Sequence, residues 1–358
     1  MRDTQRTLLA TRAGATHLLV AALVFVGGCG AAETPVATST GASDGGAVDA
    51  SADVAADADE GTDAGALDAA AADAATADIA SADASACTPV ARSTAPTTLG
   101  GNRPASVFLP DGWDGCKQWP LIVLLHGYGA TGVIQNIYLG IGARVTSHGF
   151  VLVLPEGTKS KSGKQFWDAT NACCNFEDGP VDDVAYLRGL IETATKQLAI
   201  DPARVFLIGH SNGGFMAYRM ACEAADLVAG VASLAGAVNA AAVSCKPTRP
   251  VNVLQMHGTD DATISYKGTV AYPGAEAAEQ RWIGLNGCTA APVALPAVDF
   301  DGKPAGKETV QRNVPGCDEG TQVGLWTMTG SGHIPAVNAA FKDALLAHVL
   351  AWKRTPKR

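Results

Sequence analysis

The chain has 358 residues, of which 47% are hydrophobic and 17% are charged, and its net charge is −9. This length is ample for one large globular core. Residues 30–86 contain twelve acidic residues and no Lys or Arg, which accounts for more than the whole negative charge. The rest of the chain is therefore nearly neutral, and it lacks the basic surface that nucleic-acid binding requires.

Residues 1–28 have the pattern of an export signal. Three arginines precede the apolar run 18–26, which is too short to span a bilayer, and two glycines separate it from Cys29. The stretch "VGGC" resembles a bacterial lipobox, in which the cysteine becomes the acylated first residue; ordinary secretion is the alternative. We expect an exported cell-surface or periplasmic lipoprotein, with the outer membrane a candidate, that touches the membrane only through the lipid on Cys29.

The segment that follows Cys29 is dominated by Ala, Asp, Gly, Ser and Thr, with almost no large apolar side chain. Such a segment cannot bury enough surface to offset its conformational entropy, so it should be a disordered tether. The expected organisation is a signal peptide at 1–28, the acylated cysteine and tether at 29–86, and one folded catalytic domain at 87–358.

Eight cysteines remain after Cys29, and an even number in an exported protein indicates disulfides. Spacing alone leaves their pairing open. We expect the adjacent Cys173 and Cys174 each to bridge elsewhere, with Cys222 a candidate partner for one of them. The sequence contains no Cys-x-x-Cys or His-x-Cys pattern, which argues against a structural zinc site, and no metal is expected.

Short apolar runs rich in β-branched residues alternate with helical patterns from residue 100 onward. Continuous apolar runs of this length predict strands that are buried on both faces. The predicted strands are 121–127, 149–157, 204–210, 227–236, 251–258 and 322–328, and the predicted helices are 182–198, 212–225, 275–285 and 336–352. The alternation predicts a mostly parallel sheet flanked by helices, with reactive groups at the carboxyl ends of the strands.

The stretch "RVFLIGHSNGGF" takes a predicted strand directly into a predicted helix, with Ser211 at the junction. Gly209, Ser211 and Gly213 satisfy the pattern G-x-S-x-G, in which a sharp turn exposes the serine hydroxyl above the sheet. A serine hydroxyl is a weak nucleophile, so it also needs a base and an orienting acid.

Three histidines follow Ser211 in the sequence, namely His257, His333 and His348. His257 precedes the best acid candidates, whereas the acid precedes the histidine in this arrangement. His348 lies in an amphipathic helical pattern. His333 lies in the glycine-rich stretch "TGSGH" after the last predicted strand, which makes it the expected base.

Asp260 and Asp261 both follow the predicted strand 251–258 and are the candidates for the acid. Adjacent side chains point apart, so only one can bond the imidazole, and spacing does not decide which. The oxyanion hole needs two backbone N–H groups. We expect them from Asn212, at the start of a helix, and from Tyr128, between two glycines; a plain turn is the alternative for Tyr128.

Several stretches in order resemble one family. "PLIVLLHGYGATG", "FWDATNACC", "HGTDDATISY" and "GSGH" make roughly residues 95–353 similar to the secreted polyhydroxybutyrate depolymerase-like and feruloyl esterase group of α/β-hydrolases. The resemblance implies an α/β-hydrolase fold and cofactor-free hydrolysis of carboxylic esters. It favours Asp261 as the acid and implies a Cys288–Cys317 disulfide. It also suggests Trp167 as a substrate-binding residue, with a core or rim position as the alternative.

The sequence departs from many polymer depolymerases of this group. "GSGHIPAVN" lacks the tryptophan of their "GGGHxWPG", and no appended substrate-binding domain is apparent. Both departures weaken the case for an insoluble polyester. We expect a serine hydrolase that cleaves short hydroxyalkanoate or hydroxycinnamoyl esters. Its substrate would be a small ester, a polyester or a plant cell-wall ester. A serine peptidase of the same fold and a non-catalytic tethered binding protein remain alternatives.

Overall fold

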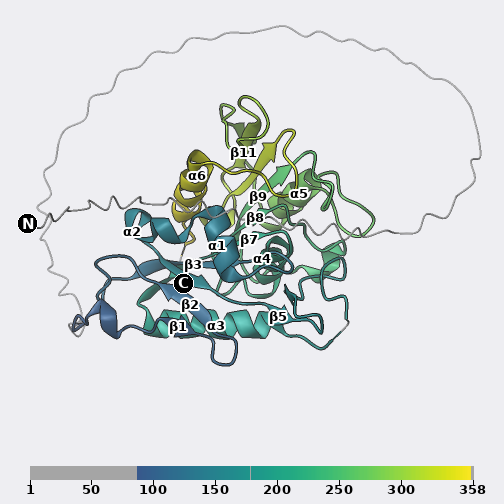
Figure 1. Ribbon diagram of the computed structural model, residues 1–358. Helices are drawn as coiled ribbons and strands as arrows, with labels where there is room; N and C mark the ends of the chain where they lie inside the picture. Colours follow the sequence, from purple (N-terminus) through teal and green to yellow (C-terminus); the bar gives the residue numbers. More distant parts are fainter. Residues whose placement is uncertain (1–86, 178, 356–358) are drawn as a thin grey trace, which may run out of the picture. The chain divides into compact units, whose positions relative to one another are not determined.

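The computed structural model describes residues 87–177 and 179–355; the expected signal peptide, Cys29 and the expected tether lie outside the described residues. The described part is built on one ten-stranded sheet, in the order β1-β2-β4-β3-β7-β8-β9-β12-β11-β10 (Figure 1). The strands of this sheet are β1 Thr98–Leu99, β2 Ala105–Phe108, β3 Trp119–Leu125, β4 Val151–Leu154, β7 Ile200–His210, β8 Gly230–Leu234, β9 Asn252–Gly258, β10 Val293–Ala294, β11 Thr309–Val314 and β12 Val323–Met328. A separate hairpin pairs β5 Thr158–Lys159 with β6 Gln165–Phe166.

The six central strands, from β4 to β12 in sheet order, run parallel to one another. They are the six strands predicted from continuous apolar runs, and their side chains are almost all buried, as a parallel sheet covered on both faces requires. The outer strands β1, β2, β10 and β11 pair antiparallel. These were not predicted, because the short or half-exposed edge strands carry no continuous apolar signal.

Helices cover both faces of the sheet. The α-helices are α1 Gly132–Leu139, α2 Val145–His148, α3 Asp183–Gln197, α4 Asn212–Glu223, α5 Ala275–Leu285 and α6 Ala339–Leu350. Short 3₁₀ turns are η1 Arg92–Thr94, η2 Gly142–Arg144, η3 Ala242–Ser244 and η4 Asp318–Gly320. One core cluster takes buried side chains from α3, α4 and α5, and the other from α1, α2 and α6. This arrangement confirms the predicted α/β architecture, in which the carboxyl ends of the central strands share one edge.

Two of the predicted helices begin at a polar side chain that caps their first amides. Asp182 accepts a hydrogen bond from the Ala185 amide at the start of α3, and Asn338 does the same for Phe341 at the start of α6. Such caps satisfy amides that have no partner within the helix. The Asn338 cap therefore lies five residues after His333 and fixes the start of α6. His333 is left in the loop between β12 and α6.

Four disulfides join the described cysteines in pairs: Cys87–Cys116, Cys173–Cys174, Cys222–Cys245 and Cys288–Cys317. The expectation that Cys173 and Cys174 would each bridge elsewhere was wrong, because they bond to each other. Cys222 instead meets Cys245, since α4 packs beside the segment that follows β8. Four disulfides indicate an oxidising compartment outside the cytosol.

Candidate active site

Ser211 lies in the turn between β7 and α4, with backbone angles φ 54° and ψ −122°. A positive φ is strained for a residue with a side chain, and here it turns the chain sharply from strand to helix. The neighbouring glycines are required by close packing: a Cβ at Gly209 would lie 2.1 Å from the Gly213 carbonyl oxygen, and one at Gly213 would lie 2.3 Å from that of Leu125. The G-x-S-x-G pattern therefore reflects contacts that leave no room for side chains.

The turn brings Ser211 to His333, which lies between β12 and α6. Ser211 Oγ is 2.9 Å from His333 Nε2, and His333 Nδ1 is 2.8 Å from Asp261 Oδ2. Asp261 Oδ1 accepts hydrogen bonds of 2.8 Å from the amides of Thr263 and Ile264. Three side chains that are widely separated in the sequence thus form one hydrogen-bonded chain.

The structure also distinguishes the two neighbouring aspartates. Asp260 is exposed and bonds the Thr259 hydroxyl, whereas Asp261 is buried and faces His333. Burial alone would raise the pKa of the Asp261 carboxyl, but hydrogen bonds from His257 and His333 outweigh burial and hold that pKa well below its usual value. Asp261 is therefore ionised at neutral pH and can accept from the imidazole.

The loop that carries His333 is held from several sides. His210 Nε2 lies 3.0 Å from the His333 carbonyl oxygen, and burial lowers the pKa of His210 to about 4, so that its ring is neutral. The Tyr138 hydroxyl donates to the Pro335 carbonyl at 2.9 Å, and Asp301 Oδ1 accepts from the Ala336 amide at 2.8 Å. These bonds fix the position of the imidazole relative to Ser211.

The backbone amides of Tyr128 and Asn212 donate to no protein atom within residues 87–177 and 179–355. The loop of Tyr128 lies against Ser211, since a Cβ at Gly127 would be 3.4 Å from the Ser211 Cβ. This loop is held by the β5–β6 hairpin, where the Gly129 amide donates to the Gln165 carbonyl at 2.7 Å. Two unpaired amide N–H groups beside a serine hydroxyl can donate hydrogen bonds to a negatively charged oxygen.

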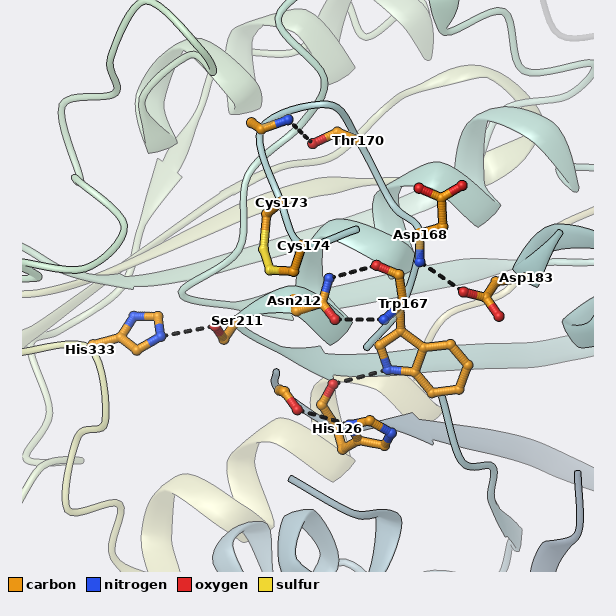
Figure 2. Close-up of a disulfide and its surroundings, with 12 residues drawn as sticks. His126, Trp167, Asp168, Thr170, Cys173, Cys174, Asp183, Ser211, Asn212 and His333 are labelled. Carbon is orange, nitrogen blue, oxygen red and sulfur yellow. Dashed lines mark hydrogen bonds between the residues drawn. A yellow bond between two sulfur atoms is a disulfide. The ribbon is translucent and has the colours of Figure 1, made fainter. Parts of the chain in front are cut away.

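Figure 2 shows that Trp167 lies close to Ser211 and Asn212. Its side chain is fully buried, with 0% exposed. The backbone amide of Trp167 donates to Asn212 Oδ1 at 2.7 Å, and Asn212 Nδ2 donates to the backbone carbonyl of Trp167 at 2.9 Å. Its indole N–H donates to the His126 carbonyl at 3.0 Å. The full burial of Trp167 corresponds to the core position that was the alternative to substrate binding, and its bonds tie its loop to the end of β3 and the start of α4.

Comparison with known proteins finds similarity to ester hydrolases. Residues 115–273, less than half of the chain, match the phospholipase/carboxylesterase family. In fold, the chain is similar to acetyl xylan esterase from Aspergillus awamori, with a TM-score of 0.51 and 15% identity over 70% of this chain and 98% of the other.

Among the sequence relatives, feruloyl esterase B of Piromyces equi is 27% identical over 251 residues, which are 64% of this chain and 42% of the relative. The putative esterase NocK of Nocardia uniformis subsp. tsuyamanensis is 31% identical over 48% of this chain and 46% of its own length. Feruloyl esterase D of Neurospora crassa is 27% identical over 68% of this chain and 78% of its own length. The chain thus spans less than half of the first two relatives.

The sequence did not predict three histidine contacts around the candidate site. His126 Nε2 accepts from the Gly157 amide at 2.9 Å, His210 bonds the loop of His333, and His257 bonds Asp261. His210 and His257 stand inside the quoted motifs "GHSNGG" and "HGTDD", so position within a motif was the available signal. Their roles depend on the direction in which the folded chain points each ring, and the spacing of residues in the sequence does not provide that direction.

Within the described residues, no group of three or more His, Cys, Asp or Glu side chains could hold a metal ion. None of the described helices is long and apolar enough to cross a membrane.

Proposed function

We propose that the protein is a serine carboxylic-ester hydrolase, with Ser211 as nucleophile, His333 as general base and Asp261 as the orienting acid. The observation that carries this proposal is the continuous hydrogen-bonded chain from Ser211 Oγ through both nitrogens of His333 to Asp261 Oδ2, at 2.9 and 2.8 Å. A nucleophile, a base within hydrogen-bond reach and a group that orients the base are the parts that acyl transfer requires.

The proposed reaction has two steps. His333 Nε2 takes the Ser211 proton as Oγ forms a bond to the ester carbonyl carbon, and the Tyr128 and Asn212 amides donate to the resulting oxyanion. The imidazolium then gives its proton to the departing alcohol oxygen as the ester C–O bond breaks. Water, deprotonated by His333, attacks the acyl-enzyme in the same way and releases the acid. The ionised Asp261 keeps the proton of Nδ1 in place and stabilises the imidazolium.

The proposed substrates are short hydroxyalkanoate or hydroxycinnamoyl esters. Apolar side chains lie near the reacting groups: Tyr128 and Phe176 pack edge to face with ring centroids 5.3 Å apart, and Ile334, which follows His333, is exposed. Such side chains favour the apolar part of an acyl or aryl group. Two of the relatives named above are feruloyl esterases, which supports a hydroxycinnamoyl substrate.

We also propose that the exported protein is anchored by acylation of Cys29. The support is the sequence "VGGC" after an apolar run, together with the disulfides of an oxidising compartment. Metabolic labelling with radioactive palmitate tests this anchor: the full chain should incorporate label, and Cys29→Ser should not. Incorporation by Cys29→Ser would contradict it.

Purified full-length protein should hydrolyse p-nitrophenyl acetate and butyrate, and Ser211→Ala should abolish this. Ser244→Ala, which removes an exposed hydroxyl on η3, is the matched control and should retain activity. A fluorophosphonate should label Ser211 only. Rates on methyl ferulate and on 3-hydroxybutyrate dimers then decide between the two acyl classes. Full activity of Ser211→Ala would reject the proposed function.

A further inference from the structure

A buried chain of hydrogen bonds continues behind Asp261, on the side away from His333. His257, at the end of β9, is 1% exposed. Its Nε2 lies 3.1 Å from Asp261 Oδ2 and 2.8 Å from the Ile264 carbonyl oxygen. Oδ2 is also the oxygen that His333 Nδ1 contacts at 2.8 Å. Two histidines therefore meet on one carboxylate oxygen.

The neighbours of His257 determine which of its nitrogens carries the proton. Gln255 Nε2 donates to the Gly236 carbonyl at 3.0 Å, and Gln255 Oε1 accepts from the Tyr218 hydroxyl at 2.7 Å. The same Nε2 lies 3.0 Å from His257 Nδ1. An amide nitrogen can only donate, so Nδ1 accepts and the proton of the neutral ring is on Nε2. That proton points at Asp261 Oδ2 and the Ile264 carbonyl.

We propose that His257 is a positioning residue for ester hydrolysis. Its Nε2–H donates to Asp261 Oδ2. This hydrogen bond fixes the orientation of the carboxylate toward His333 and controls how strongly the carboxylate attracts the proton on His333 Nδ1. This inference rests on the proposed function. With Oδ1 held by two amides and Oδ2 by His257, the carboxylate cannot rotate away from His333. A second donor on Oδ2 also draws negative charge from it, which weakens its attraction for the imidazolium.

Other titratable groups face these residues and must be considered in any pH measurement. Tyr266 lies edge-on to His257, with ring centroids 5.8 Å apart, and His210 lies 5.2 Å from His333. Tyr218 reaches His257 only through Gln255, and burial keeps its pKa far above the working range. Burial lowers the pKa of His210 to about 4, so both groups stay neutral above pH 5. A change in the acidic limb of the pH profile is therefore not caused by Tyr218 or His210.

The test compares His257→Phe with His257→Gln in the full-length protein. Phenylalanine keeps a ring in the same place but has no donor, whereas glutamine can place an amide N–H where Nε2 stood. We expect His257→Phe to lower kcat at least about tenfold with little change in KM, and to move the acidic limb of kcat/KM to higher pH. His257→Gln should restore most of kcat and the original limb.

A matched control is Tyr266→Phe, which keeps the ring against His257 and removes a hydroxyl that bonds Thr327 instead. It should leave kcat and the pH profile unchanged. An unshifted pH profile in His257→Phe would overturn the proposal. So would equal losses of kcat in His257→Phe and His257→Gln, if those losses match the loss of folded protein measured by circular dichroism. Failure of the proposed function looks different, because the unsubstituted protein would then be inactive or Ser211→Ala would remain active.

Discussion

The Nε2 atom of His210 lies 3.0 Å from the backbone carbonyl oxygen of His333, although 123 positions separate the two residues. The residue just before Ser211 therefore fastens the loop that carries its proposed base. The two rings are 5.2 Å apart, and the His210 ring also packs near Tyr138. One side chain thus links the serine turn, the His333 loop and α1.

Replacing His210 by phenylalanine should keep the ring contacts and remove the bond to the His333 carbonyl. We expect kcat to fall about tenfold, because a small displacement of a catalytic group costs one to two orders of magnitude in rate. Steady-state kinetics on p-nitrophenyl butyrate provide the measurement. His148 is partly exposed on α2, and His148→Phe is the control. Its kcat should equal that of the unsubstituted protein. An unchanged kcat in His210→Phe would refute the link.

Asn212→Ala should destabilise the protein by about 2 to 3 kcal/mol, because the buried N–H and C=O of Trp167 both lose their partner. Urea unfolding at pH 7.5 measures this loss. Asn212→Asp keeps an acceptor for the Trp167 amide but faces its carbonyl with a carboxylate, so the aspartate variant should lose stability as well. Wild-type stability in the alanine variant would show that the Trp167 bonds contribute nothing.

Replacing Cys288 and Cys317 together by serine should lower the free energy of unfolding by about 3 kcal/mol, since this disulfide closes a loop between residues 29 positions apart. Replacing Cys173 and Cys174 together should cost much less in chain entropy, because these cysteines are adjacent. Denaturant midpoints of the two double variants make the comparison. Equal losses would argue against loop closure as the origin of the stabilisation.

Stability should decrease as the pH falls from about 6.5 towards 4. Burial lowers the pKa values of His126, His210 and His348 to about 4 from 6.5, so the unfolded chain binds more protons in this interval. Each histidine should cost about 1 to 2 kcal/mol at pH 5 and almost nothing at pH 7.5. Asp261 acts in the same direction at lower pH, since its lowered pKa stabilises the fold above about pH 4.

The variant that isolates one such histidine is His348→Phe. His348 lies between Trp326 and Trp352 on α6, and its Nε2 has no partner among the described residues. Phenylalanine preserves the aromatic contacts and cannot be protonated. We expect its stability relative to wild type to be about 1 to 2 kcal/mol better at pH 5 than at pH 7.5, measured by urea unfolding at both pH values. An identical difference at the two pH values would exclude His348 from the acid response.

Particular residues show how far sequence reasoning reached. The run at β7 and the glycines around Ser211 were sufficient to predict a buried strand and a sharp turn, because burial and close packing restrict residue type locally. Trp167 marks the limit. Its type fitted either a substrate surface or the core, and only the bonds from Asn212 and to His126 place it in the interior.

The disulfides show the same limit. Cys173 and Cys174 could be counted but not paired, because pairing depends on which sulfur atoms the folded chain brings together. Asp260 and Asp261 were likewise equivalent in spacing, and it is the direction of each side chain after β9 that turns Asp261 to His333.

The sequence by itself determined the alternating strands and helices, the serine turn and the export-type composition, since these follow from local patterns of polarity and residue size. The tertiary structure decided which aspartate faces the imidazole, that Cys173 bonds Cys174, and that His210 contacts the His333 loop and His257 contacts Asp261. The contacts of His333 with His210 and Asp261 join residues 123 and 72 positions apart, and the packing of helices against the sheet sets the direction of each side chain.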